Sequence, residues 1–215
     1  MKLTKRVIAA ISPLMEAQGF RLHGNCFYQV RDNIAFCVEI EKPAGNLYAA
    51  CYILPLYMPL EGRIFTYGRR IASIPKGKYP AVSQASDSVS IEGWCEEFCG
   101  YLLRSVLPLF KKIRSPESLI SKGRYFRFRF FPCPKIDFMQ LETFTYLYLG
   151  KEKEAARKIA QVQKELQKAD FLTAAVKARI AEGIEEAAKN VMHRTNTERN
   201  AYYQTIIANN MENCF

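Results

Sequence analysis

Residues 124–131, with the sequence RYFRFRFF, alternate arginine side chains with aromatic rings. Arginine neutralises phosphate and aromatic rings stack on bases, so this pattern is typical of surfaces that bind single-stranded nucleic acid. If the segment is a β-strand, Phe126, Phe128 and Phe130 share one face, which must be buried. The other face then carries Tyr125, Arg127, Arg129 and Phe131. On this interpretation, the second face is the one available for a function.

A second alternating segment, AFCVEIEK at residues 35–42, offers a structural alternative for these arginines. It places Glu39 and Glu41 on the face opposite its apolar residues. If the two strands are neighbours, Arg127 and Arg129 face these two carboxylates, and each pair contributes about 0.2–1 kcal/mol. This hypothesis explains both patterns, so we favour it over nucleic-acid binding for Arg127 and Arg129, with solvent exposure left open.

A separate basic group has no such alternating acidic segment nearby in the sequence, and it is the better candidate for a surface that meets a polyanion or an acidic protein. Its members are Arg63, Arg69, Arg70, Lys76 and Lys78. The chain carries a formal charge of +10, and the whole excess lies in residues 1–136, because residues 137–215 hold equal numbers of basic and acidic side chains. The predicted polyanion surface therefore belongs to the first part of the chain.

The thiols and histidines give only weak catalytic or metal-binding candidates. His23 and Cys26, in the sequence HGNC, could pair as base and nucleophile, although a turn with an incidental cysteine is the favoured interpretation. Cys95 and Cys99 share one helix face, but they lie among apolar residues and are interpreted as core. Cys133 lies between two prolines, where we expect an extended loop.

Catalytic and phosphate-binding fingerprints are missing from the sequence. It contains no GxxxxGK[ST], GxGxxG, GxSxG or HExxH motif, each of which would place a phosphate loop, a nucleophile or a zinc ion. No catalytic residue, metal site or cofactor is therefore predicted.

Hydrophobic periodicity predicts the elements of the first part. A helix is expected at residues 2–18, with its apolar positions at helical spacing and Gly19 at its end. Three antiparallel strands should follow, separated by turns at Asp32–Asn33 and at residues 43–46. A fourth strand is expected within residues 63–74 and a loop within residues 76–90. A second core helix begins at Ile91 and buries Trp94, Cys95, Phe98, Leu102, Val106 and Leu109.

From residue 137 the sequence reads as helices at about 137–149, 152–168, 171–190 and 197–212. We expect helix caps at Asp137, Asp170 and Asn196. The first two helices are typical of one tetratricopeptide-type hairpin, with Gly150 at the turn and Ala155, Ile159 and Val162 as contact positions. The later helices do not repeat this pattern, so the segment is interpreted as a helical extension rather than a repeat array.

Residues 1–115 resemble the bacterial family called domain of unknown function 4304. The similarity rests on GFRLHGNCFYQV, the hydrophobic strands after it, GRRI at residues 68–71 and the long helix that ends in LPLF. It implies a small bacterial α+β domain and transfers no activity. Neither RYFRFRFF nor the helical extension takes part in the resemblance.

These observations predict an α+β protein of two parts. Residues 1–136 form a helix, an antiparallel meander of three to five strands and a long helix, and residues 137–215 form an α-helical extension. We expect a bacterial cytoplasmic protein without a membrane segment, because prolines and charges interrupt its apolar stretches. A non-catalytic module that binds a protein partner is the favoured function. A nucleic-acid binder is the alternative, and an enzyme of unrecognised type is the third hypothesis.

Overall fold

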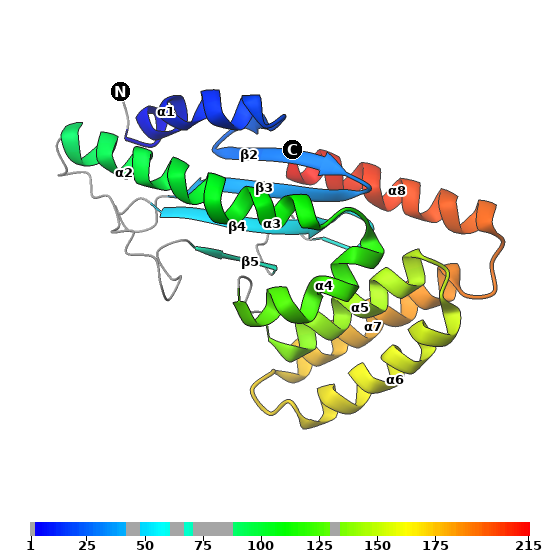
Figure 1. Cartoon of the computed structure of the whole chain (residues 1–215). Coiled ribbons are helices and arrows are strands. Elements are labelled where there is room, and N and C mark those ends of the chain that lie inside the picture. Colours follow the sequence, from blue (N-terminus) through cyan, green and yellow to red (C-terminus); the bar gives the residue numbers. More distant parts are fainter. Residues whose placement is uncertain (1–2, 42–47, 61–66, 71–87, 130–133) are drawn as a thin grey trace. The chain divides into compact units, whose positions relative to one another are not determined.

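A computed structural model describes residues 3–41, 48–60, 67–70, 88–129 and 134–215 (Figure 1). For residues 69–70, 88–90 and 123–129 it describes the backbone alone. Helix α1 (Leu3–Ala17) comes first, an antiparallel sheet follows, and the remaining described elements are helices. The predicted α+β class and order of elements are confirmed.

Helix α1 buries one stripe of side chains, as its spacing predicts. Leu3, Val7, Ile11 and Met15 recur every four residues and are all buried. Gly19 ends the helix with a φ of +80°, a conformation that side chains with a Cβ rarely adopt. The N–H groups of Gly19 and Phe20 donate to the carbonyls of Glu16 at 2.9 Å and Met15 at 3.0 Å, which satisfies the last turn.

The sheet has the strand order β1-β2-β3-β4-β5, the order of the chain itself. The predicted turn at Asp32–Asn33 joins β2 to β3. The φ angles of the two residues are 47° and 59°, and a two-residue hairpin with a type I′ turn requires positive φ at both positions. The turn predicted at residues 43–46 lies outside the described residues. The strands are β1 (Arg21–His23), β2 (Cys26–Arg31), β3 (Ile34–Glu41), β4 (Tyr48–Pro55) and β5 (Tyr67–Arg70).

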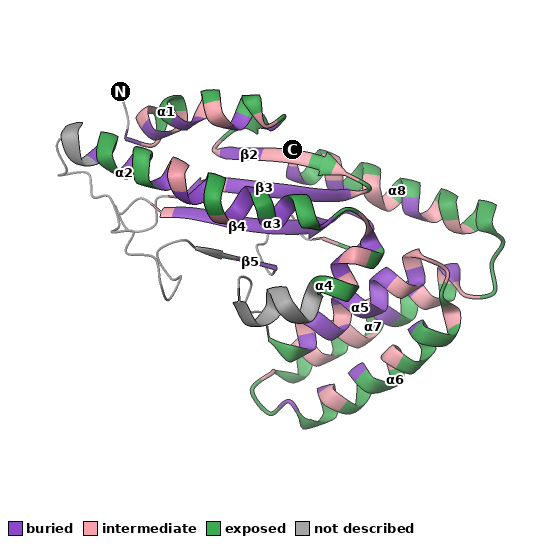
Figure 2. Ribbon diagram, viewed as in Figure 1, coloured by how far each residue is buried: buried purple, intermediate pink, exposed green. Residues whose placement is uncertain are grey.

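The long predicted helix has three consecutive parts. Helix α2 (Ser88–Tyr101) continues through a π-helical segment, Leu102–Val106, into α3 (Leu107–Lys112). All seven predicted core positions between Ile91 and Leu109 are buried. Burial colouring shows β3 and β4 as almost wholly buried strands beneath this helix (Figure 2). The predicted loop at residues 76–90 lies mostly outside the described residues.

Arg31 and Phe36 join the sheet to α3. The Arg31 guanidinium lies 4.1 Å from the centre of the Phe36 ring, and its Nη2 donates to the Phe110 carbonyl at 3.0 Å. The Phe36 and Phe110 rings pack 5.1 Å apart. Burial lowers the pKa of Arg31, but the ring face and the carbonyl compensate part of the lost hydration.

The strand considered above for RYFRFRFF is wrong for residues 124–129. Residues 130–131 lie outside the described residues. Residues 124–129 lie in helix α4 (Pro116–Arg129), so strand alternation does not apply to Tyr125, Arg127 or Arg129. Pro116 opens the helix and Glu117 lies in its first turn, and both favour a helix start. Strand β3 pairs with β2 and β4, so the predicted ladder of Arg127 and Arg129 against Glu39 and Glu41 is wrong as well.

Four further helices match the predicted extension: α5 (Lys135–Tyr148), α6 (Glu152–Lys168), α7 (Ala174–Val191) and α8 (Asn196–Cys214). The predicted caps are wrong. Thr173 and Thr195 cap α7 and α8, and α5 begins after Pro134 without a side-chain cap. A threonine hydroxyl one position before each helix satisfies the N–H groups that the sequence argument gave to Asp170 and Asn196.

Helices α5 and α6 pack as the predicted hairpin. Gly150 turns between them with a φ of +66°. Ala155 and Val162 are buried and Ile159 is half-buried. Between the helices, Lys158 Nζ lies 2.7 Å from Glu142 Oε2, and both side chains are less than 15% exposed.

The chain forms two compact units, and each unit is made of three separate segments of the sequence. The first contains residues 1–54, 65–115 and 128–132, and therefore the sheet and helices α1 to α3. The second contains residues 133–215 together with residues 116–127 and 55–64. The predicted boundary near residue 136 thus marks the start of the long helical segment, while the helical unit also takes in two earlier pieces of chain.

Candidate functional site

Within the helical unit, the side chain of Asn210 holds a short turn of the main chain. Pro55–Met58 form this turn, in which the Met58 N–H donates to the Pro55 carbonyl at 3.0 Å. The amide nitrogen of Asn210 on α8 donates to the carbonyls of Leu56 and Met58, each at 2.7 Å. Asn210 is 3% exposed, so these bonds form away from water, where leaving either carbonyl unpaired would be costly.

Tyr57 is the side chain that the turn inserts among the helices. It is fully buried, and its ring stacks on that of Tyr148 with centroids 4.3 Å apart and planes 12° from parallel. Its hydroxyl lies 2.9 Å from Thr145 Oγ1, and Thr145 in turn donates to the Leu141 carbonyl at 2.6 Å. Because the Thr145 hydroxyl has one hydrogen, which the Leu141 carbonyl receives, Tyr57 must be the donor to Thr145.

Burial raises the pKa of Tyr57, which keeps its hydroxyl protonated and able to donate. The pocket therefore recognises a phenol by a stacking ring and a single acceptor. We call Thr145, Tyr148, Tyr203 and Asn210, grouped around the turn Pro55–Met58, the turn clamp.

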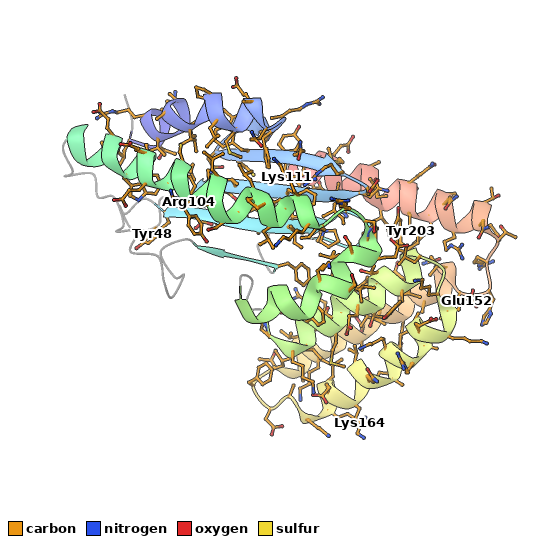
Figure 3. The ribbon with its side chains drawn as sticks, in the orientation of Figure 1. Tyr48, Arg104, Lys111, Glu152, Lys164 and Tyr203 are labelled. Atoms are coloured by element: carbon orange, nitrogen blue, oxygen red, sulfur yellow. The ribbon has the colours of Figure 1, made fainter. Side chains whose placement is uncertain are left out.

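Tyr203 completes the aromatic part of the turn clamp. Its ring meets Tyr148 edge-on, with centroids 5.0 Å apart, and Figure 3 labels it on α8. Tyr203 is 3% exposed, and its hydroxyl has no hydrogen-bond partner among the described residues. Burial raises its pKa. A buried hydroxyl without a partner is rare in folded proteins, so this one is a polar group that a ligand atom could satisfy.

Helix periodicity explains why these side chains converge. Tyr203 and Asn210 are seven residues apart, two turns of α8, so they lie on one face of that helix. Thr145 and Tyr148 are three apart, about one turn of α5. The turn clamp thus needs only one face of each helix and one turn from a distant part of the chain.

The basic residues predicted from the sequence are only partly described. Arg63, Lys76 and Lys78 lie outside the described residues, whereas Arg69 and Arg70 lie in β5, in register with Cys51 and Ala50. Tyr125, Arg127 and Arg129 lie in α4, where only the backbone is described. Their role in binding a polyanion or an acidic partner stays a prediction.

Another group of cations is exposed on the long helix of the sheet unit and directly after its end. Arg104, Lys111, Lys112 and Arg114 are all exposed, and no acidic residue lies between positions 104 and 114. Figure 3 labels Arg104 and Lys111, which lie seven residues apart. Lys111 donates to the Gln18 side chain at 3.1 Å, and its exposed position leaves the charge near solvent.

The described thiols are buried or half-buried, and His23 and Cys26 are register partners across β1 and β2. Cys26 is buried, with its sulfur 3.7 Å from the Phe27 carbonyl and 3.8 Å from the Tyr52 hydroxyl, while His23 is exposed. Burial raises the pKa of Cys95 to about 11, which keeps the thiol protonated at neutral pH. Cys133 lies outside the described residues. Within the described part of the chain, no group of three metal-ligating side chains comes together.

Glu39 has a neutral partner in the sheet. The Tyr52 hydroxyl on β4 donates to Glu39 Oε2 at 2.5 Å. Burial is the main cause that raises the pKa of Tyr52, and the nearby Cys37, Cys26 and Glu39 raise it further. Tyr52 therefore stays neutral and acts as the hydrogen-bond donor to Glu39.

Comparisons with known proteins return no matching family model, no matching curated protein and no matching solved structure. The resemblance of residues 1–115 to domain of unknown function 4304 therefore stays a prediction. Among the described residues, no helix has both the length and the apolar character needed to cross a membrane.

None of the turn-clamp residues was identified from the sequence. Residues 43–60 form a long uncharged stretch, but this feature bears only on whether the segment could span a membrane. A usable signal exists in α8, where Tyr203, Asn210 and Cys214 recur on one face that is buried. An asparagine on such a face needs partners for its amide, and this predicts a polar contact but not its location.

Proposed function

We propose that this protein is a non-catalytic interaction module of the bacterial cytoplasm whose helical unit binds polypeptide. The observation that carries the proposal is the pair of bonds from Asn210 to the Leu56 and Met58 carbonyls. Backbone carbonyls are common to all peptides, and a buried aromatic side chain beside them supplies specificity, which is the usual division of roles in peptide recognition.

Electrostatics also favours a binding role over catalysis. The described thiols are buried or half-buried, and burial raises the pKa of Cys95, Cys99 and Cys51. A nucleophile or a general base works best with a pKa near the working pH, and the polar groups by which the turn clamp contacts the turn are a neutral hydroxyl and an amide. Such groups can orient a peptide, but they supply no proton transfer near neutral pH.

Selection from a displayed library of random peptides tests the proposal on the full chain. We expect reproducible enrichment of peptide sequences on the immobilised protein, relative to the tag alone and after nuclease treatment. Failure to enrich any peptide at low salt, or turnover of a screened substrate by the pure protein, would contradict it.

A second candidate function, binding of a polyanion by the sheet unit, is favoured by the exposed cations Arg104, Lys111, Lys112 and Arg114. Fluorescence anisotropy of labelled single- and double-stranded DNA and RNA, at several salt concentrations, tests it. Binding should weaken steeply as salt rises, and reversing Lys111 and Lys112 to Glu should reduce the salt dependence.

The same titration covers the predicted set when Arg69 and Arg70, or Arg127 and Arg129, are reversed. Reversal of Lys153 and Lys164, exposed on α6 of the helical unit, is the matched control. Absence of binding at low salt would exclude this function.

A further inference from the structure

The turn clamp is built to recognise features that another polypeptide can present. It contacts two backbone carbonyls, at the second and fourth positions of the turn, and one aromatic ring at the third position. The Leu56 and Met58 side chains are buried and supply apolar surface. Any tight turn with an apolar, a tyrosine and an apolar residue in succession offers the same groups.

Resting on the proposed binding function, we infer that the turn clamp exchanges its own turn for a tyrosine-bearing β-turn of a partner protein. Pro55–Met58 is then an internal competitor that keeps the pocket closed until the partner arrives. Thr145 makes tyrosine a better occupant than phenylalanine, because its oxygen accepts from the phenol while its hydrogen is committed to Leu141.

The unpaired hydroxyl of Tyr203 supplies a reason why a partner can displace the internal turn. With the internal turn in place, this buried group has no hydrogen-bond partner in the part of the chain that the structure describes. A partner turn with a polar side chain beside its tyrosine can satisfy it, and this adds a contact that Pro55–Met58 does not make. The partner must overcome the high effective concentration of a segment on the same chain, and the added contact helps it to do so when the internal turn is intact.

The test measures binding of a labelled synthetic peptide, LPLYMPL, to the full chain by anisotropy. In the Tyr57→Ala variant the internal competitor lacks its ring, and the apparent affinity should rise by at least about tenfold over the unmodified chain. Adding Asn210→Ala to this variant should abolish that gain, whereas Asn209→Ala, at the exposed neighbouring position, should leave it unchanged. A peptide with alanine in place of tyrosine should not bind.

Tyr57→Phe serves where Tyr57→Ala does not fold, because it removes only the bond to Thr145 and should give a smaller gain of the same sign. The inference would be overturned if the peptide bound the unmodified chain and the Tyr57 variants with equal affinity. It would also be overturned if the peptide bound neither Tyr57→Ala nor Tyr57→Phe although the variant unfolds cooperatively. Enrichment of other peptides by the full chain, insensitive to Asn210→Ala, would also overturn it while leaving the proposed binding function intact.

Discussion

At the scale of single residues, substitution of Asn210 should lower the stability of the protein strongly. Asn210→Ala leaves the buried carbonyls of Leu56 and Met58 without donors, and we expect the free energy of unfolding to fall by about 2–4 kcal/mol. Denaturant unfolding of the full chain measures this. Asn209→Ala on the exposed side of α8 is the control and should change stability by less than about 0.5 kcal/mol. Equal effects of the two substitutions would contradict the assigned role of Asn210.

Tyr203 and Tyr57 should respond in opposite ways to loss of the hydroxyl. Tyr203→Phe removes a buried hydroxyl that has no partner among the described side chains and backbone groups, so stability should stay the same or rise by up to about 1 kcal/mol. Tyr57→Phe removes the donation to Thr145 and should cost about 1 kcal/mol. Thermal unfolding of both variants gives the comparison, and a clear loss of stability in Tyr203→Phe would show that its hydroxyl has a partner.

At the scale of elements, two ion pairs of the helical hairpin form a natural comparison. Lys158→Met leaves the Glu142 carboxylate unpaired between α5 and α6, where it is 9% exposed, and should cost about 3–5 kcal/mol. Lys135→Met breaks the pair with Glu165, whose side chains are 56% and 31% exposed, and should cost no more than about 1 kcal/mol.

Replacing the buried pair together, with Lys158→Met and Glu142→Leu, should recover most of the loss, because no buried charge is then left alone. Urea unfolding of the three variants measures these differences. A Lys158→Met chain as stable as Lys135→Met would show that the pair is not protected from water.

The start of α8 has a stability that depends on pH. The Thr195 hydroxyl accepts from the Glu198 N–H, and the Thr195 N–H donates to the Glu198 carboxylate at 2.9 Å. That backbone bond is the main cause that lowers the pKa of Glu198 below 4.5. A lowered carboxylate pKa stabilises the fold above the unfolded value and loses this contribution as pH falls through the folded value.

We therefore expect the difference in stability between the unmodified chain and Glu198→Gln to shrink as pH falls below about 4.5. Thr195→Ala should cost about 1 kcal/mol at neutral pH. Thermal unfolding followed across this pH range checks both expectations. A difference for Glu198→Gln that grows in acid would contradict the assigned cap.

At the scale of the whole molecule, the two interleaved units predict how a fragment behaves. A chain of residues 1–136 keeps the turn Pro55–Met58 but lacks Tyr148, Tyr203 and Asn210. Leu56, Tyr57 and Met58 then lose the helical partners that bury them, so the fragment should bind a hydrophobic dye. The same fragment with Leu56→Ser and Tyr57→Ser should bind less dye. A fragment that unfolds with the midpoint of the intact chain and binds no dye would contradict this dependence.

The parts of the fold with a regular period could be predicted from the sequence. The buried stripes of α1 and of the long helix, the Asp32–Asn33 turn and the four helices after residue 134 all follow from local spacing and turn chemistry. RYFRFRFF misled because alternation over a short apolar segment does not separate strand from helix. The start signals at Pro116 and Glu117 were the better evidence.

The candidate site could not be predicted, because its contacts depend on distance along the chain rather than on local pattern. Asn210 and Leu56 are separated by 154 residues, and neither has a distinctive neighbour in sequence. Lys158 and Glu142 likewise pair only because α5 and α6 fold back on each other. Local sequence thus predicts which faces are buried, while the partner of each buried polar group comes from tertiary packing.

The separation between Leu56 and Asn210 along the chain also delays formation of their contact during protein synthesis. A ribosome adds about 5–20 residues per second, so Asn210 is made roughly 8–30 s after Leu56. During that interval the apolar residues of the turn lack their helical partners in the nascent chain. We therefore expect a chaperone that binds apolar segments of nascent chains to associate with residues around Tyr57 until helix α8 has emerged.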